Sequence, residues 1–256
     1  HSYFGTLKTK IFLWIERFLV LFTTKIIAIS ELQRKELVAL KIAPEHKFVV
    51  IPLGFELDKF KDVKRTGFLR DQLKVSADEK LIGIVGRLVP IKNHHFALQV
   101  LQEVLKKYHQ PLKLVIIGKG ELEQLLKEEV ATYGLNHSVI FTDWQHDLPK
   151  VYPDLDIVIL TSLNEGTPVA LIEAMACGVP VVSTNVGGVG DIVKPGERGF
   201  LVEKGDAVAF ADAIIKLLTD NPLKEKLCKN ARDYIFQTYS VERLAQDIRS
   251  LYLTSS

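Results

Sequence analysis

From Leu81 onward, short runs of apolar residues alternate with longer segments in which apolar residues recur at helical spacing. The short runs are LIGIVG (81–86), KLVIIG (113–118), SVIFTD (138–143), DIVILTS (156–162) and PVVST (180–184). The longer segments are Phe96–Tyr108, Leu122–Tyr133 and Val169–Cys177. Continuous apolar runs of this length are typical of parallel strands that are buried on both faces. The pattern predicts an α/β fold, with a Rossmann-like parallel sheet and helices on both of its faces.

Several of these strands end in a polar or glycine-containing turn that opens the next helix. These turns are GRLVPIKN (86–93), GKGE (118–121), TSLNEGTP (161–168) and STNVGG (183–188). Ligands of parallel α/β sheets bind at the carboxyl ends of the strands. We therefore expect the chemistry of this protein at these turns.

The first part of the chain has a different organisation. A helix over residues 11–22, a strand at 25–30, a helix from Glu31 and a strand at 47–52 resemble the last βαβ unit of a preceding domain. Residues 54–80 are charged and irregular, which suits a connection with a short helix. The expected domains are therefore 1–55, the end of an amino-terminal domain; 56–79, a connection; and 80–256, a ligand-binding domain that finishes in three helices.

Composition narrows the range of partners. The formal net charge of +2 over 256 residues gives no reason to expect nucleic acid as a partner. Two cysteines fit plain thiols in a reducing, cytoplasmic setting better than a disulfide framework. The longest apolar stretch, residues 11–22, is interrupted by Glu16 and Arg17 and is too short to span a membrane. We expect a buried amphipathic helix there, and flanking lysines leave peripheral contact with an anionic inner membrane face as the alternative.

The most informative stretch runs from Glu165 to residue 180. Thr167 is a suitable N-cap and Pro168 suits the first helical position, so a helix is expected to start there and to stop at Gly178. Glu165 then lies in the turn and Glu173 in the second helical turn. The free amides of such a helix start favour an anion such as a diphosphate. The alternative is an ordinary strand–helix turn with two solvated glutamates.

The phrase TSLNEGTPVALIEAMACGVPVVSTNVGG (161–188) resembles the retaining glycosyltransferases of the GT-B fold, in particular family 4, whose mark is two glutamates separated by seven residues. The resemblance extends to GRLVPIKN, the GKG turn and the earlier phrases AIS (28–30) and VIPLGF (50–55). It implies transfer of a sugar from a nucleotide-diphosphate sugar, with a UDP-sugar as the expected donor, to a glycan, lipid or small-molecule acceptor. Transfer would retain the anomeric configuration, by front-face attack without an enzyme nucleophile.

The resemblance also implies roles for individual residues. Arg87 and Lys92 would bind the donor diphosphate, as fixed cations that stabilise the leaving phosphate without a metal or cofactor. Glu173 would accept hydrogen bonds from the ribose hydroxyls, and Glu165 would orient the sugar and help electrostatically. The expected catalytic residues are thus Glu165, Arg87 and Lys92, and the expected substrate-binding residues are Gly86, Gly166, Thr167, Pro168, Leu171, Glu173 and Trp144.

Other candidate residues carry weaker expectations. The family reads the nucleotide base at the segment 142–146, where Trp144 either covers the base or packs against the sheet edge. Asp143 stands where family members commonly have glycine. The histidines His94, His95 and His146 lack metal-ligand spacing, and the pair Asp154 and Asp156 precedes a strand and should be structural.

Three functions remain open at this stage. The first is a glycosyltransferase, of which this chain is a fragment or an incomplete part; the second is a non-catalytic nucleotide-sugar-binding module; the third is a GT-B nucleotide-sugar epimerase. Glu165, Glu173, Arg87 and Lys92 together favour the transferase. The family's catalytic histidine belongs to the amino-terminal domain, and His1 is the candidate for it.

Overall fold

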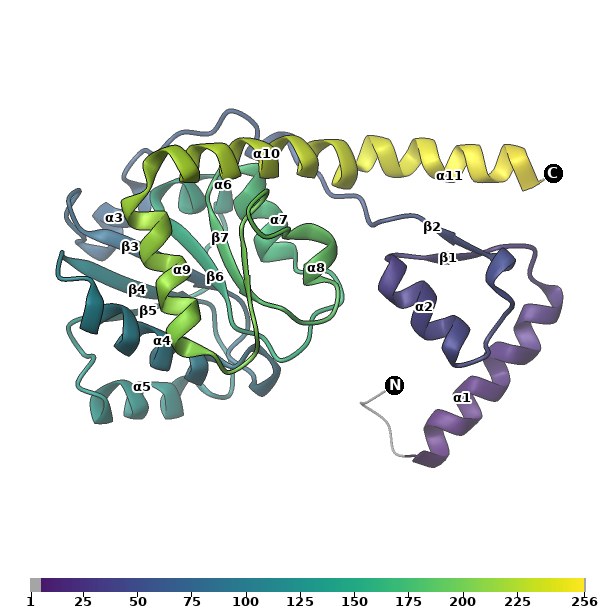
Figure 1. Ribbon diagram of the computed structural model, residues 1–256, viewed down its shortest axis with the longest axis horizontal. Helices are drawn as coiled ribbons and strands as arrows, with labels where there is room; N and C mark the ends of the chain where they lie inside the picture. The colour runs from purple at the N-terminus through teal and green to yellow at the C-terminus, as the bar shows by residue number, and fades with distance from the viewer. Residues whose placement is uncertain (1–5, 256) are drawn as a thin grey trace. The chain divides into compact units, whose positions relative to one another are not determined.

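A computed structural model describes residues 6–255 of the chain, and the side chains of residues 10–254 (Figure 1). The chain forms two compact units. The first combines the residues up to Phe55 with those from Thr238 onward, and the second is Glu56–Gln237. Each unit has its own parallel strands and is described by itself.

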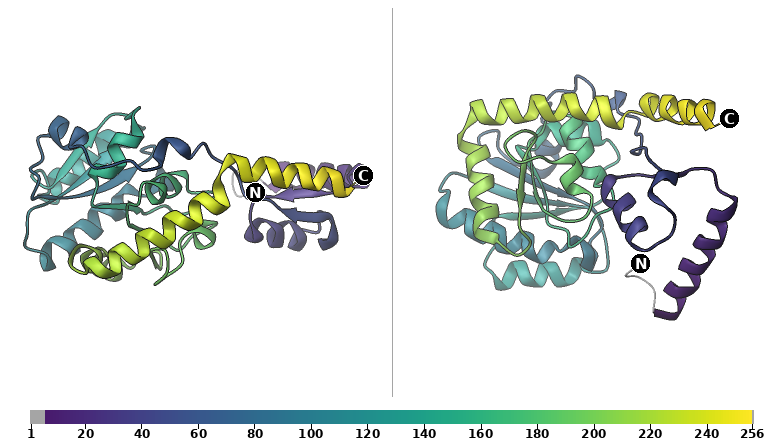
Figure 2. Two further views of the ribbon diagram at one scale, coloured as in Figure 1. Left: turned by 90° about the horizontal axis from the view of Figure 1, so that it is seen from above. Right: turned by 45° about the vertical axis from the view of Figure 1, so that its right-hand side comes forward.

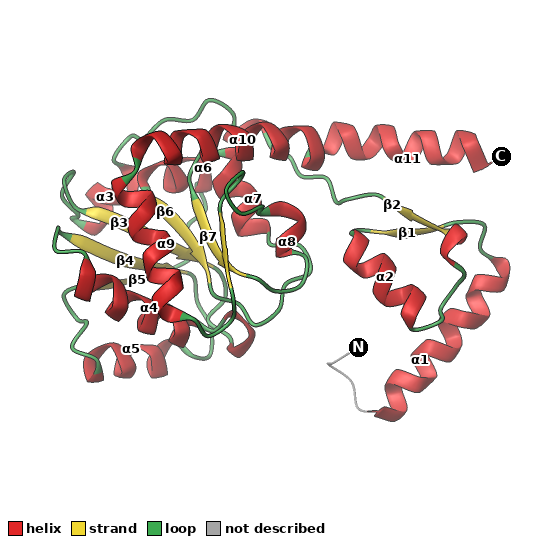
Figure 3. Ribbon diagram, in the orientation of Figure 1, coloured by secondary structure: helices red, strands yellow, loops and turns green. Residues whose placement is uncertain are grey.

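The second unit is built on a six-stranded parallel sheet in the order β5-β4-β3-β6-β7-β8, drawn in yellow in Figure 3. Its strands are β3 (Lys80–Val85), β4 (Leu112–Ile117), β5 (Val139–Thr142), β6 (Ile157–Leu160), β7 (Val181–Thr184) and β8 (Phe200–Val202). The first five were predicted from the apolar runs, and the parallel α/β fold is confirmed. The sequence pattern did not indicate β8, because its three residues make an apolar run too short to stand out.

Helices cover both faces of this sheet (Figures 1 and 2). One layer consists of α4 (His94–Lys107), α5 (Glu123–Thr132) and α9 (Ala207–Thr219), which bury alternate sheet residues such as Ile82, Leu114 and Ile157 in one core. The other elements of the unit are the helices α3 (Phe68–Leu73), α6 (Leu148–Val151), α7 (Val169–Ala176), α8 (Val189–Ile192) and α10 (Asn221–Tyr239) and the short 3-10 turns η3 (Asp58–Phe60), η4 (Pro90–Lys92) and η5 (Tyr152–Asp154). The last two residues of α10 belong to the first unit. α7 packs on β6 and β7.

The two aspartates Asp154 and Asp156 hold the connecting segment against the sheet. The fully buried Asp154 carboxylate accepts hydrogen bonds from the amides of Thr66, Gly67 and Leu69, at 3.2, 2.9 and 2.7 Å. Asp156 pairs with the buried Arg70 at 2.7 Å and accepts from the Leu81 amide at 2.8 Å. Both aspartates thus have structural partners at the amino end of β6, as expected.

The first unit contains the predicted βαβ element. Strands β1 (Ile26–Ala28) and β2 (Phe48–Val50) pair in parallel and are joined by α2 (Glu31–Ala39). Ser30 caps α2 by accepting from the Gln33 amide, and the Gln33 side chain accepts from the Ile29 amide. This reciprocal capping explains why the helix starts at Glu31.

The expected end of the ligand-binding domain was wrong. Residues from Thr238 onward, including α11 (Val241–Ser255), belong to the first unit and not to that domain. The Arg243 guanidinium donates to the carbonyls of Pro52 and Leu53. These bonds connect α11 to the segment that follows β2.

The segment expected to be a buried amphipathic helix is helical but exposed. It forms α1 (Thr6–Leu19) and the short turn η1 (Val20–Phe22). Trp14 and Phe22 are 68% and 77% exposed. Arg17 joins the helix to the end of α2 through the carbonyls of Leu40 and Lys41. Leu13 and Val20 pack on the small core of this unit. The rest of the apolar face of the helix is not covered by the other described residues of the first unit.

Candidate functional site

The loops after β3 and β6 meet at the carboxyl edge of the sheet, because these two strands are neighbours. The Leu163 amide donates to the Ile91 carbonyl at 2.8 Å, and the Thr161 hydroxyl donates to the Lys92 carbonyl at 3.1 Å. These bonds hold the two loops in register. They bring together residues that lie some seventy positions apart in the sequence.

The cation and the first glutamate of the predicted site form an ion pair across these loops. Lys92 Nζ lies 2.7 Å from Glu165 Oε1, and the Ser162 hydroxyl donates to the same oxygen at 2.6 Å. The lysine stem passes Gly86 closely, since a Cβ on that glycine would lie 3.7 Å from Lys92 Cε. The Glu165 side chain is only 10% exposed, so it is fixed by both partners. Sequence reasoning did not identify Ser162.

Arg87 follows Gly86 directly and is exposed. Its guanidinium has no hydrogen bond or ion pair with any other residue between 6 and 255. It is therefore free to bind an anion, and its role as a diphosphate ligand stays a prediction.

Close backbone packing shapes the floor beside Glu165. The Gly188 amide donates to the Glu165 carbonyl at 2.8 Å, and a Cβ on Gly187 would lie 2.0 Å from that carbonyl oxygen. A Cβ on Gly188 would lie 2.0 Å from the carbonyl oxygen of Gly166. Glycine is thus required at both positions of the loop after β7. A Cβ on Gly166 itself would meet nothing within 4 Å, so open space adjoins the turn that carries Glu165.

The start of α7 differs from the sequence prediction. The helix begins at Val169, and Pro168 takes the N-cap position with a non-helical ψ of 82° and no side-chain cap bond. Thr167 therefore does not cap the helix through its side chain. The helix ends as expected, because Gly178 has a φ of +74°. Leu171 is fully buried and its amide donates to the Pro168 carbonyl, which leaves this predicted substrate-binding residue little to offer a ligand.

Glu173 is held by a buried tyrosine that sequence reasoning missed. The Tyr152 hydroxyl donates to Glu173 Oε2 at 2.9 Å, and Tyr152 is fully buried. Burial raises the pKa of the Glu173 carboxyl, while the Tyr152 hydrogen bond and Lys59 act in the opposite direction. The other carboxylate oxygen, Oε1, accepts no hydrogen bond from the described residues. Glu173 thus keeps one acceptor atom for a ligand.

Trp144 lies at the same edge of the sheet. A Cβ on Gly118, at the end of β4, would lie 3.4 Å from the outer edge of the Trp144 ring and 2.1 Å from the Gly86 carbonyl oxygen. The ring is 43% exposed. It therefore packs over the end of β4 beside Gly86, and it also borders open space.

The histidines take separate positions. His94 is 1% exposed with neither ring nitrogen hydrogen-bonded, and burial lowers its pKa to about 4. His95 pairs with Glu129 at 2.9 Å. Within the described part of the chain, no group of three or more histidine, cysteine, aspartate or glutamate side chains is placed to hold a metal ion. Over the same residues, no helix has the length and apolar character needed to cross a membrane.

The second unit is thus an α/β domain with a parallel sheet, whose carboxyl edge carries a fixed cation, an acidic turn and glycine-lined loops. The family model of glycosyl transferases group 1 matches residues 66–234, and the chain belongs to this family, which has the GT-B fold. The matched residues include Arg87, Lys92, Glu165 and Glu173.

Individual relatives agree with this assignment. The chain is 31% identical over 245 residues to the capsular polysaccharide biosynthesis glycosyltransferase CapM of Staphylococcus aureus, covering 94% of this chain and 64% of the relative. It is 28% identical over 246 residues to the UDP-Gal:alpha-D-GlcNAc-diphosphoundecaprenol alpha-1,3-galactosyltransferase of Escherichia coli, covering 95% and 63%. The crystal structure of Anabaena HepE in complex with UDP-glucose superposes with a TM-score of 0.79 at 25% identity, covering 90% and 64%. The chain thus spans less than two thirds of the length of these proteins.

Proposed function

We propose that this chain binds the donor of a glycosyltransferase reaction, and that this donor is a UDP-sugar. We further propose that the protein transfers the sugar to an acceptor with retention of the anomeric configuration. The observation that carries the proposal is the Lys92–Glu165–Ser162 cluster beside the open space at Gly166. In this cluster, a fixed cation that can bind phosphate lies next to a fixed carboxylate that can orient a sugar. The family membership of the chain supports the same function.

The proposed donor rests on chemistry and on relatives. The HepE structure contains UDP-glucose, and the E. coli relative is named for a UDP-linked galactose. Both names support a UDP-sugar for this chain. The named roles of the relatives in capsule and lipid-linked glycan assembly support a glycan or lipid-linked acceptor.

Each site residue has a distinct role in the proposed reaction. Arg87 and Lys92 neutralise the negative charge that grows on the leaving diphosphate, which is the role of a metal ion in other transferases. Glu165 orients the sugar and stabilises positive charge developing at its anomeric carbon. Glu173 accepts hydrogen bonds from the ribose through its unoccupied oxygen. No residue acts as a nucleophile in this scheme.

Binding of UDP and of uridine to the chain tests this proposal directly. Lys92→Ala should weaken UDP binding by about tenfold or more in titration calorimetry, because it removes a charge-assisted contact, and it should change uridine binding little. Lys107→Ala is the matched control, since Lys107 ends α4 and pairs with Asp212 away from the predicted site. Equal losses for UDP and uridine would refute the assigned role of Lys92.

A second arm tests the proposed independence from metal ions. UDP binding should be the same in excess EDTA as in magnesium, since side chains supply the positive charge. Loss of binding in EDTA that magnesium restores would contradict the scheme.

A further inference from the structure

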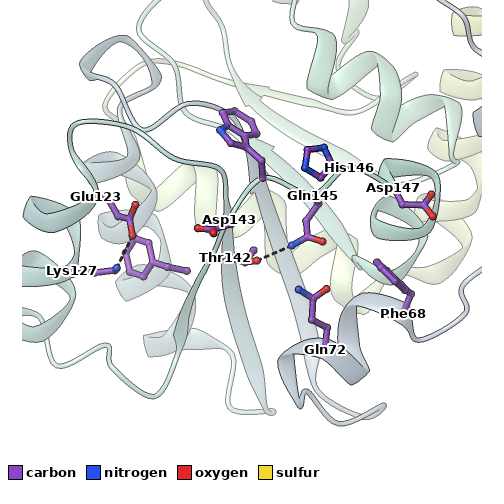
Figure 4. A pocket seen from close by; sticks show the side chains of 11 residues that line it. Phe68, Gln72, Glu123, Lys127, Thr142, Asp143, Gln145, His146 and Asp147 are labelled. Carbon is purple, nitrogen blue, oxygen red and sulfur yellow. Dashed lines mark hydrogen bonds and ion pairs between the residues drawn. The ribbon is translucent and has the colours of Figure 1, made fainter.

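A cavity of about 670 Å³ beside β5 belongs to the predicted donor site and offers no separate one (Figure 4). Its lining includes the segment 142–146, where we expect the nucleotide base to be read. Exposed apolar side chains gather elsewhere, in the first unit. Among the side chains that the structure describes, twenty large apolar ones are exposed, and eight of these lie within residues 11–22 of α1 and η1.

The exposed side chains of α1 cover one half of the helix. At about 100° of turn per residue, one half of the circumference holds all six of them. They are Ile11, Phe12, Trp14, Ile15, Phe18 and Leu19. The charged residues of this stretch, Glu16 and Arg17, fall in the other half, where Glu16 Oε2 is buried and Arg17 donates to two carbonyls that follow α2. This polarity is the reverse of that of a helix that faces water.

Three aromatic rings form a row along the exposed face. Trp14, Phe18 and Phe22 follow one another at intervals of four residues and are 68%, 49% and 77% exposed. The Trp14 and Phe18 rings stack with their centroids 6.0 Å apart, and the Phe18 and Phe22 rings meet edge to face with centroids 5.4 Å apart. Tryptophan and phenylalanine on one face are typical of helices that lie on a bilayer surface, with the rings at the boundary between headgroups and acyl chains.

Cations surround this row without carboxylate partners. Lys10 and Lys25 are exposed at either end of the apolar stretch, and Lys47 donates to two carbonyls at the end of η1. None of these three lysines forms an ion pair with another residue in the described part of the chain. Residues 1–55 hold eight lysines and arginines against four aspartates and glutamates, a net charge of +4, whereas the whole chain carries +2. The positive charge is thus concentrated around α1.

We propose that α1 is a membrane-surface anchor, whose apolar face inserts into the headgroup region of a bilayer that contains anionic lipids. The aromatic row supplies the apolar contact, and the surrounding lysines attract the acidic headgroups. The charge of the first unit favours this partner over a second copy of the chain, because two copies would bring like charges together. The proposal goes beyond donor binding and does not require that the chain bind UDP.

Vesicles test the proposal on the full chain without nucleotide. The Trp144→Phe variant, in which Trp14 is the remaining tryptophan, would be mixed with vesicles of phosphatidylcholine alone or of phosphatidylcholine and phosphatidylglycerol in equal parts. The chain should float with the anionic vesicles and should bind the neutral ones about tenfold or more weakly. On binding, the Trp14 emission should shift to shorter wavelength, and lipids with brominated acyl chains should quench it.

Single substitutions separate the apolar from the electrostatic contribution. Phe22→Ser should weaken binding to anionic vesicles by about tenfold, and Phe22→Leu should retain most of the binding. Lys10→Gln and Lys25→Gln should each weaken it by about fivefold at low salt and should not change binding to neutral vesicles. Lys204→Gln and Val208→Ser are the matched controls, since both residues are exposed in the second unit, and neither change should alter binding.

The proposal is wrong if the chain binds neither kind of vesicle, or if Phe22→Ser leaves vesicle binding unchanged. It is also wrong if both kinds of vesicle bind equally, since equal binding would mark α1 as an apolar surface that another protein segment covers. Sedimentation without vesicles gives the remaining contrary outcome, a dimer that Phe22→Ser dissociates, which would assign the face to a second copy. Failure of UDP to bind would leave the vesicle result intact and would count against the proposed function alone.

Discussion

Replacement of Asp154 by asparagine should destabilise the second unit strongly while leaving its shape unchanged. The carboxylate is fully buried and accepts from three backbone amides of the segment that leads into α3. The position of the Asp154–Asp156 pair before a strand predicted a structural role and not a metal site. The backbone partners of Asp154 agree with that prediction.

The magnitude follows from the three hydrogen bonds. In the better orientation of the asparagine, its oxygen keeps the bonds to Thr66 and Gly67, each weakened by about 1 kcal/mol because the acceptor is no longer charged. Its NH2 group then faces the Leu69 amide, and a buried donor without an acceptor costs about 1–3 kcal/mol. The expected loss is therefore about 3–5 kcal/mol in the free energy of unfolding.

Urea denaturation followed by Trp144 fluorescence, in the Trp14→Phe background, measures this loss in the second unit. Asp233→Asn is the control, because Asp233 is exposed on α10, and it should change stability by less than about 0.5 kcal/mol. Added magnesium should not alter the difference between the variants. A loss below about 1 kcal/mol for Asp154→Asn, or a stability that depends on magnesium, would refute the structural role.

Three further outcomes are expected. His94, buried with a pKa of about 4 against 6.5 when unfolded, is neutral in the fold. The stability that it contributes is complete above pH 6.5, and about 3 kcal/mol is lost as the pH falls from about 6.5 to about 4, so His94→Leu should flatten the stability–pH curve measured by urea denaturation over this range. Tyr152→Phe removes the hydrogen bond that lowers the pKa of Glu173, so the acid limb of the pH profile of uridine binding should move to higher pH; an unmoved profile would exclude this positioning role. Ser162→Ala frees Glu165 and should lower turnover with an acceptor more than it weakens UDP binding, a split that kinetics and calorimetry measure together.

Much of the second unit was predictable because its strands are continuous apolar runs. Both faces of the sheet are covered, so residues such as Ile82 and Val158 are buried. The strands are therefore apolar at every position, and this pattern can be recognised in the sequence. The glutamate phrase was equally readable, since glycines at 187 and 188 are required by backbone contacts with the Glu165 turn. Strand β8 could not be predicted, because three residues are too few to show a periodic pattern. The N-cap position of Pro168 could not be predicted either, because it depends on a single dihedral angle.

The partners of the two glutamates show where sequence reasoning stops. Ser162 and Tyr152 lie 3 and 21 positions from the carboxylates they contact, on a loop and on a 3-10 turn, and neither stands in a pattern of its own. Ser162 reaches Glu165 through the fold of their shared loop, and Tyr152 reaches Glu173 because η5 packs against α7. The pair that depends on strand order is Lys92–Glu165, since that order puts the loops after β3 and β6 side by side. The same reasoning applies to α1, whose apolar face follows from helical spacing, while what covers that face does not. A sequence can thus name the groups that carry the chemistry, but the side chains that fix their orientation become visible only when the topology places them together.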